Sequence, residues 1–169
     1  MTVMEDGVRV PSREGGRPTV VAGVDGSPGS RAALIDAMRS ASLRGARLHV
    51  VAVYEPPEWR LGPTPGRPLP SRAEIEAEVL AAVRDMVTDV AYELGGEHLR
   101  RPEVDVVALP GQAAEVLVDA AEGADELVVG HRGRGAVASA LLGSVGLGCL
   151  LHAPCPVRIV PLSSPPGDS

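Results

Sequence analysis

Five short runs of β-branched and aliphatic residues alternate along this chain with longer segments of helical pattern, and this alternation constrains the fold more than any other feature. The strand-like runs occupy residues 18–25, 46–54, 103–109, 124–130 and 155–161. The helical patterns between them occupy residues 27–45, 71–94, 111–123 and 144–153. Strand–helix–strand units join parallel strands through right-handed crossovers. The sequence therefore predicts an α/β three-layer sandwich, in which a five-stranded parallel sheet carries helices on both faces.

The first two helices carry recognisable signals at their ends. Ser27 is suited to cap a helix, Pro28 follows at the first helical position, and Gly45 is a suitable stop. Ser71 is the expected cap of the longest helix, which we expect to end at Gly95 and Gly96. Aliphatic residues recur there every three or four positions and predict one buried stripe of Ile75, Val79, Val83, Met86, Val90 and Leu94.

Three segments lack a regular pattern. Residues 1–17 are polar with Gly and Pro, and residues 162–169 are unsuited to regular structure, so both are expected to be disordered tails. Residues 55–71 are rich in proline, which is excluded from helix interiors and central strands, and predict a long loop. We expect one domain over residues 18–161.

The composition excludes several classes of protein. The chain has 169 residues, a net charge of −6 and no lysine. Without lysine it has neither the phosphate-binding lysine of a P-loop nor Schiff-base chemistry. The negative charge argues against a nucleic-acid partner. No apolar run approaches membrane-spanning length and the first residues lack a signal-peptide core, so we expect a cytoplasmic protein without a membrane partner.

The cysteines and most histidines form no pattern typical of a catalytic or metal site. Cys149 and Cys155 lack CxxC spacing and are expected to be packing thiols of a reducing compartment. His49 and His152 lie in apolar runs and are also expected to pack, whereas His98 is expected at the surface. We predict no metal site and no catalytic residue.

The residues that follow the first and fourth strands predict a ligand site. Ligands of open parallel sheets lie beyond the carboxyl ends of the strands. Asp25 follows the first strand, while Gly130 and Gly133 follow the fourth and are expected to adopt positive φ and expose their amides. Gly143 and Ser144 lie where the next helix begins, and unpaired amides there favour an anion. This pattern favours the phosphates of a nucleotide.

A simpler interpretation of the same residues stays open at this point. The glycines would then only permit a tight crossover, Ser144 would only cap its helix, and Asp25 would only cap the first turn of the helix that follows it.

The segments VVAGVDGSPGS, VVAVYEPP and HAPCPVRIV, together with the G-2x-G-9x-G-S spacing of Gly130, Gly133, Gly143 and Ser144, resemble the universal stress protein family. The resemblance covers roughly residues 19–161. It implies the strand order 3-2-1-4-5, which places the ends of the first and fourth strands side by side. It also implies that ATP, AMP or ADP, with or without Mg²⁺, binds in the crevice between them.

The resemblance further implies a role for each site residue. Asp25 would contact the nucleotide near base and ribose, and the backbone of Val53 would face adenine. The glycines after the fourth strand would approach ribose and phosphate, and the start of the last helix would hold phosphates through amides and a hydroxyl. The full implied set is Gly23, Val24, Asp25, Val53, Gly130, Gly133, Gly143, Ser144 and Val145.

Two positions depart from the family pattern. His131 stands where relatives usually carry Ser or Thr, and Gly146 stands where they often carry another hydroxyl. The missing hydroxyl weakens the expected grip on phosphate. His131, Arg132 and Arg134 would supply counter-charge to the phosphates, or would form a solvated loop tip.

We therefore expect a regulatory protein that binds adenine nucleotide and acts in stress response through nucleotide-dependent conformation and contacts with an unknown protein partner. Two alternatives stay open: a dimeric interaction module that has lost nucleotide binding, and a weak adenine-nucleotide hydrolase. The resemblance implies a homodimer formed through the last strand, which comprises Pro156, Val157, Arg158, Ile159 and Val160. An exposed apolar edge strand would otherwise be prone to aggregation.

Overall fold

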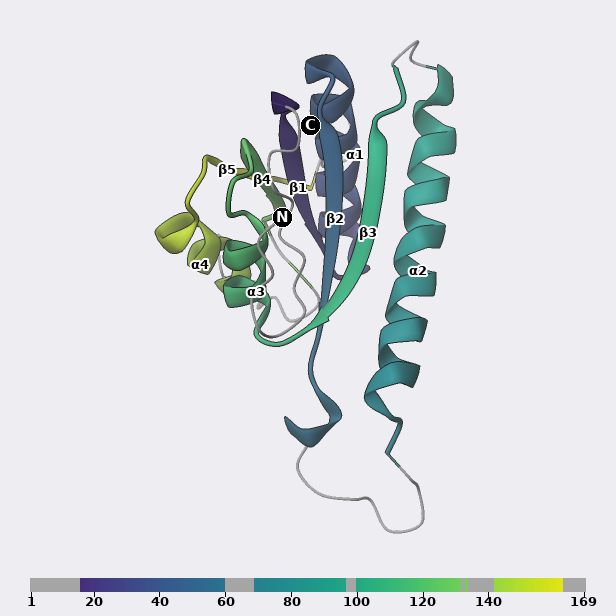
Figure 1. The fold of residues 1–169 in the computed structure, drawn as a ribbon, viewed down its shortest axis with the longest axis vertical. Helices are drawn as coiled ribbons and strands as arrows, with labels where there is room; N and C mark the ends of the chain where they lie inside the picture. Colours follow the sequence, from purple (N-terminus) through teal and green to yellow (C-terminus); the bar gives the residue numbers. More distant parts are fainter. Residues whose placement is uncertain (1–15, 60–68, 97–99, 132, 134–141, 163–169) are drawn as a thin grey trace, which may run out of the picture.

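The computed structural model describes residues 16–59, 69–96, 100–131, 133 and 142–162 of the chain. Five parallel strands form one sheet in the order β3-β2-β1-β4-β5 (Figure 1). This confirms both the predicted fold class and the strand order that the family resemblance implied. The strands are β1 (Thr19–Val24), β2 (Arg47–Tyr54), β3 (Glu103–Pro110), β4 (Glu126–Gly130) and β5 (Val157–Val160).

Helices cover both faces of the sheet and make three layers. α1 (Pro28–Arg44) and α2 (Arg72–Glu93) pack on one face, and α3 (Ala113–Ala120) and α4 (Ser144–His152) pack on the other. Successive residues of a strand point to opposite faces, so Val20 packs with the first pair of helices and Val21 with the second. Both side chains are fully buried, which explains why strands of a doubly covered sheet lack polar alternation.

The predicted signals at the ends of α1 are confirmed. Ser27 is the N-cap and accepts a hydrogen bond from the Ser30 amide at 3.1 Å. Gly45 ends the helix in the left-handed conformation with φ of 62°, a conformation that favours glycine.

Ser71 caps α2 through a capping box: its hydroxyl accepts from the Glu74 amide at 3.2 Å, and its own amide donates to the Glu74 carboxylate at 2.7 Å. The stripe on α2 is buried in its C-terminal half, at Val83 and Val90, but only half-buried at Ile75 and Val79. The N-terminal turns of α2 extend past the end of the sheet, which is why they lack a full covering (Figure 1).

Two short 3₁₀ segments flank α2. η2 (Pro57–Trp59) interrupts the predicted proline-rich loop, whose residues 60–68 lie outside the described part of the chain. η3 (Leu94–Gly96) follows α2 directly, so the predicted helix end is confirmed to within two residues. The outer parts of both predicted tails, residues 1–15 and 163–169, also lie outside the described residues, as does His98.

Of the two histidines expected to pack in the interior, one prediction is confirmed and the other is wrong. His49 is buried, as expected, and its Nδ1 lies 2.9 Å from the carboxylate of Asp105 on the neighbouring strand. His152 is exposed at the last residue of α4, so the expectation that it packs in the interior is wrong. An apolar run on a short helix covers the outer side as well as the inner one, and His152 lies on the outer side. Cys149, a residue of α4, is fully buried in the core, while Cys155 is half-buried.

None of the helices within the described ranges is long and apolar enough to cross a lipid bilayer.

Candidate functional site

The carboxyl ends of β1 and β4 lie next to each other, because β1 pairs with β2 on one side and with β4 on the other. Each strand of a parallel sheet delivers its following loop to the same edge, so the residues after β1 and β4 share one region. The site is built from these two loops and from the start of α4.

The loop after β1 is a tight turn organised by Asp25. Its Oδ1 accepts a hydrogen bond from the Ser27 amide at 2.9 Å, and Gly26 between them has φ of 81°. Ser27, not Asp25, is the N-cap of α1, so the simpler interpretation of Asp25 as the cap of that helix is wrong. The carboxylate instead stabilises the turn through one oxygen, and its other oxygen lies toward the loop after β4.

Gly133 lies against that second oxygen. A Cβ built on Gly133 would be 2.5 Å from Oδ2 of Asp25, a distance no real Cβ contact shows. Gly133 does not have positive φ, so the expected conformational reason for this glycine is wrong. A side chain at this position would instead have to displace the Asp25 carboxylate from its place in the turn.

Gly130, the last residue of β4, also lies in a close contact that leaves little room for a side chain. Its φ is not positive either, and a Cβ there would be 2.6 Å from the carbonyl carbon and oxygen of Gly29. The backbone of β4 therefore touches the first turn of α1 directly. Sequence reasoning missed Gly29; its signal was a second glycine inside GSPGS, at a helical position where glycine is unfavourable.

The start of α4 presents amides that have no partner in the helix. Gly143 is the N-cap in extended conformation, with φ of −70° and ψ of 157°, and its N–H donates to the carbonyl of His131 at 2.8 Å. Ser144, Val145 and Gly146 then form the first turn, where amides have no intrahelical acceptor and the helix dipole is positive. Ser144 does not cap α4, so that part of the simpler interpretation is wrong.

The family resemblance implied phosphate contacts from Gly143, Ser144 and Val145. Among the described residues, the Gly143 amide donates to the carbonyl of His131, and the amides without an acceptor in the helix are those of Ser144, Val145 and Gly146. This difference follows from the N-cap position: a cap at Gly143 makes the next three residues the first turn.

His131 connects the site to the end of β5. Its amide donates to the carbonyl of Val160 at 2.9 Å, and its Nδ1 accepts from the amide of Leu162 at 3.3 Å. Arg132 and Arg134, the other predicted counter-charges, lie outside the described residues.

The remaining predicted residues lie on the strands beside the site. Val24 ends β1 opposite Ala52, so Val53 continues β2 one residue beyond the end of β1. Gly23 lies behind the site: a Cβ there would be 2.7 Å from Cδ1 of Leu117, so it allows α3 to pack closely on β1. The structure thus brings Asp25, Gly130 and Gly133 into the β1–β4 contact region, joins Gly143 to it through His131, and places Gly23 in the packing layer. Val53 has no direct contact with these loop residues among the described interactions.

These features define an open parallel α/β domain with a glycine-rich contact between the loops that follow its two central strands, β1 and β4. The model of the universal stress protein family matches residues 16–161. The chain belongs to the universal stress protein family.

Sequence similarity to known universal stress proteins supports this family membership. A universal stress protein of Thermus aquaticus is 37% identical over 145 residues, which cover 84% of this chain and 97% of that protein. A universal stress protein of Mycobacterium tuberculosis is 34% identical over 150 residues, again 84% of this chain but 47% of the relative. The chain thus spans about half the length of the mycobacterial relatives it matches.

Solved structures of other proteins have the same fold as this chain. A universal stress protein crystallised in complex with cAMP is 28% identical, covers 86% of this chain and 98% of its own, and superposes with a TM-score of 0.62. The protein MJ0577 shares the fold with a TM-score of 0.64 at 18% identity, over 87% of this chain and 97% of that one.

Proposed function

We propose that this protein binds an adenine nucleotide at the β1–β4 edge and acts as a regulatory protein in stress response. Two observations carry the proposal: the amides of Ser144, Val145 and Gly146 have no acceptor within α4, and Gly133 in the loop that leads to α4 lies against Asp25. Amides and the helix dipole suit phosphate oxygens, and the hydroxyl of Ser144 adds another donor. A relative with 28% identity in complex with cAMP supports the choice of adenine.

Different residues of this chain would bind the phosphates, the ribose and the base of the nucleotide. The first turn of α4 would hold phosphates, the carboxylate of Asp25 would accept from ribose hydroxyls, and the end of β2 at Val53 would lie against the base. ATP, ADP and AMP all fit this division. The described residues bring no group of three metal-ligating side chains together, so Mg²⁺ would be bound mainly by the phosphates themselves.

Nucleotide binding would act through the loop after β4, because that loop joins β4 to the phosphate-binding turn of α4. A bound phosphate would fix the start of α4 relative to Asp25, and a protein partner would recognise the resulting conformation. A cytoplasmic location stays a prediction from the sequence.

Calorimetric titration with ATP and Mg²⁺ tests the proposal. Gly143→Val should greatly reduce binding, because it adds a branched side chain directly before the amides proposed to hold phosphate, yet valine tolerates the extended conformation of the N-cap. Gly96→Ala is the matched control, because the space around Gly96 is open and its φ is not positive. Affinity of the unchanged protein weaker than about 1 mM, near −4.1 kcal/mol, would favour the interaction module instead.

Turnover distinguishes the hydrolase alternative from binding alone. Release of inorganic phosphate from ATP, abolished by Asp25→Ala, would favour an enzyme. Binding without turnover agrees with the regulatory role.

We also propose a homodimer through β5. β5 is an edge strand of the described sheet, and the neighbouring helix α4 exposes Leu147, Leu150 and Leu151 by 50%, 47% and 68%. The guanidinium of Arg158 holds β5 in place through ion pairs with the carboxylates of Asp36 at 2.9 Å and Glu126 at 2.7 Å. An apolar edge held this firmly suits pairing with a second copy. Light scattering that finds a monomer at micromolar concentration would contradict the dimer.

A further inference from the structure

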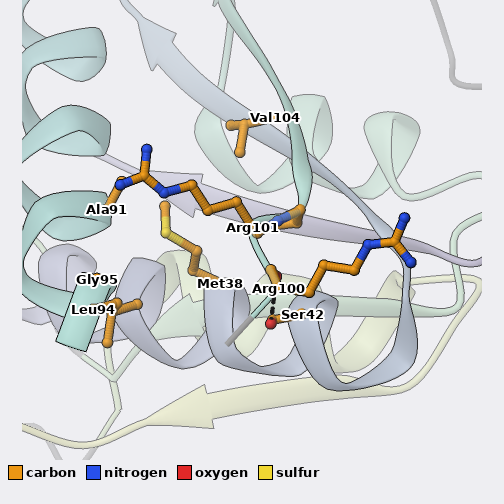
Figure 2. A pocket seen from close by; sticks show the side chains of 9 residues that line it. Met38, Ser42, Ala91, Leu94, Gly95, Arg100, Arg101 and Val104 are labelled. Atoms are coloured by element: carbon orange, nitrogen blue, oxygen red, sulfur yellow. Dashed lines mark hydrogen bonds between the residues drawn. The ribbon is translucent and has the colours of Figure 1, made fainter. Parts of the chain in front are cut away.

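A cavity lies at the end of the sheet opposite to the proposed nucleotide site. It has a volume of about 170 Å³ and lies between the C-terminal halves of α1 and α2 and the start of β3 (Figure 2). Helices of this fold run antiparallel to the strands, so these three element ends share the amino edge of the sheet. A ligand here would not touch the residues proposed to bind nucleotide.

The inner walls of this cavity are apolar. Met38 of α1 and Leu94 after α2 belong to the buried core, and Ala91 and Val104 pack against that core. A cavity of about 150 Å³ with aliphatic walls stays dry and accepts benzene in another protein. The cavity of this protein therefore has room for a group the size of a benzene ring or a chain of about six carbons.

The mouth of the cavity carries positive charge that the described part of the chain does not neutralise. Arg100 and Arg101 both line the cavity, and neither has a carboxylate partner among the described residues. Other arginines differ, since a carboxylate oxygen lies within 4 Å of each of Arg17, Arg31, Arg44, Arg47, Arg72 and Arg158.

Arg101 is the residue placed to meet a ligand. Figure 2 shows its side chain extended along the cavity toward Ala91, whereas that of Arg100 points to the other side. The Nη2 atom of Arg101 is 3.9 Å from the Cβ position built on Gly95, which places the guanidinium beside the end of α2. The carbonyl of Arg100 is fixed by the hydroxyl of Ser42, which donates to it at 2.6 Å.

We propose that this cavity binds a small amphipathic carboxylate. The apolar part of the ligand lies among Met38, Leu94 and Val104, and its carboxylate pairs with the guanidinium of Arg101. A planar guanidinium offers parallel N–H groups that match a carboxylate, so one arginine suffices for the head group. The net charge of −6 does not attract anions to the protein as a whole, so specificity depends on this local charge.

Titration with benzoate and hexanoate tests the proposal, with benzyl alcohol as a neutral analogue of similar shape. We expect saturable binding of the two carboxylates with Kd on the order of 1 mM or tighter, and amide shifts in nuclear magnetic resonance spectra at Ala91, Leu94 and Val104. Benzyl alcohol should bind at least about tenfold more weakly than benzoate, because it lacks the charge-assisted hydrogen bonds. Absence of saturation by both carboxylates in the millimolar range would overturn the proposal.

Two variants locate the ligand. Arg101→Gln should weaken benzoate binding about tenfold without a change in stability, since the side chain is exposed. Arg84→Gln is the matched control, because Arg84 is an exposed arginine on α2 away from the cavity lining. Ala91→Leu should fill the cavity and abolish binding, with circular dichroism to verify the fold.

Two results would contradict the assignment. Equal benzoate affinity in Arg101→Gln and the unchanged protein would remove the role of the guanidinium. Displacement of benzoate by ATP would place benzoate in the nucleotide crevice. The comparison of Arg101→Gln with the unchanged protein does not depend on nucleotide affinity, so the carboxylate proposal can fail while the nucleotide proposal stands, and the reverse.

Discussion

Replacement of Gly130 by alanine tests the close contact on which the β1–β4 region depends. A Cβ at this position would lie 2.6 Å from two backbone atoms of Gly29 and 3.0 Å from the amide nitrogen of Ser30, whereas ordinary contacts begin at 3.4 Å. Gly29 has no side chain to rearrange, so the end of β4 and the first turn of α1 must separate by several tenths of an ångström. The φ of Gly130 is not positive, so backbone strain contributes nothing and the effect is purely one of packing.

Overpacking of this kind costs about 1–3 kcal/mol of unfolding free energy, and the rigid backbone on both sides favours the upper part of that range. For a domain of this size, the melting temperature should fall by on the order of 5 °C. Urea unfolding of Gly130→Ala, compared with the unchanged protein, measures the loss. The control is Gly96→Ala, which meets no atom within 4 Å and should change stability by less than about 0.5 kcal/mol.

The same variant should also affect the proposed nucleotide site. Gly130 precedes His131, whose carbonyl accepts from the Gly143 amide at 2.8 Å and so positions the start of α4. Displacement of β4 would move that acceptor and weaken ATP binding. Gly130→Ala with stability equal to that of Gly96→Ala would refute the packing argument, whatever its affinity for ATP.

Three further predictions concern single groups elsewhere in the domain. Burial lowers the pKa of His49, and Asp105 opposes this shift, so the unfolded chain binds more protons below about pH 6.5 and the stability of the protein should fall on acidification. His49→Gln should flatten the dependence of the unfolding free energy on pH between about 5 and 8. A slope as steep as that of the unchanged protein would contradict this prediction. Burial raises the pKa of Cys149 to about 11, so in a Cys155→Ser background this thiol should resist iodoacetamide at neutral pH until denaturant is added. Mass spectrometry measures the alkylation, and rapid modification of the native protein would disprove the burial of Cys149. Ser71→Ala removes the capping box of α2 and should cost about 0.5–2 kcal/mol in thermal or urea unfolding, whereas an unchanged midpoint would mean that the cap adds nothing.

Local signals in the sequence were enough to predict the helices and strands and several helix ends. Ser27, Gly45 and Ser71 mark helix ends through hydrogen bonds and conformations that depend only on neighbouring residues, and all three were predicted correctly. The stripe on α2 gave the correct face but not the degree of burial, because burial depends on how far the sheet extends beneath the helix.

The reasons behind the glycines could not be predicted in the same way. Gly130 and Gly133 were identified as site residues, but their expected positive φ is absent. Their partners, Gly29 and Asp25, are distant in the sequence, and only the assembled sheet brings the two loops together. Gly148 is a further example: a Cβ there would be 2.7 Å from that of Ala114, so this glycine lets α4 approach α3 and is not merely a weak helix former.

The sequence by itself determined the succession of strands and helices, the family, and the loops on which the proposed site rests, because periodicity, capping and turn residues act over a few neighbouring positions. The tertiary structure decided which amides begin α4, which oxygen of Asp25 turns toward the loop after β4, and where the cavity lined by Arg101 lies. Those features arise from contacts between segments remote along the chain, whose distances are set only when the layers pack.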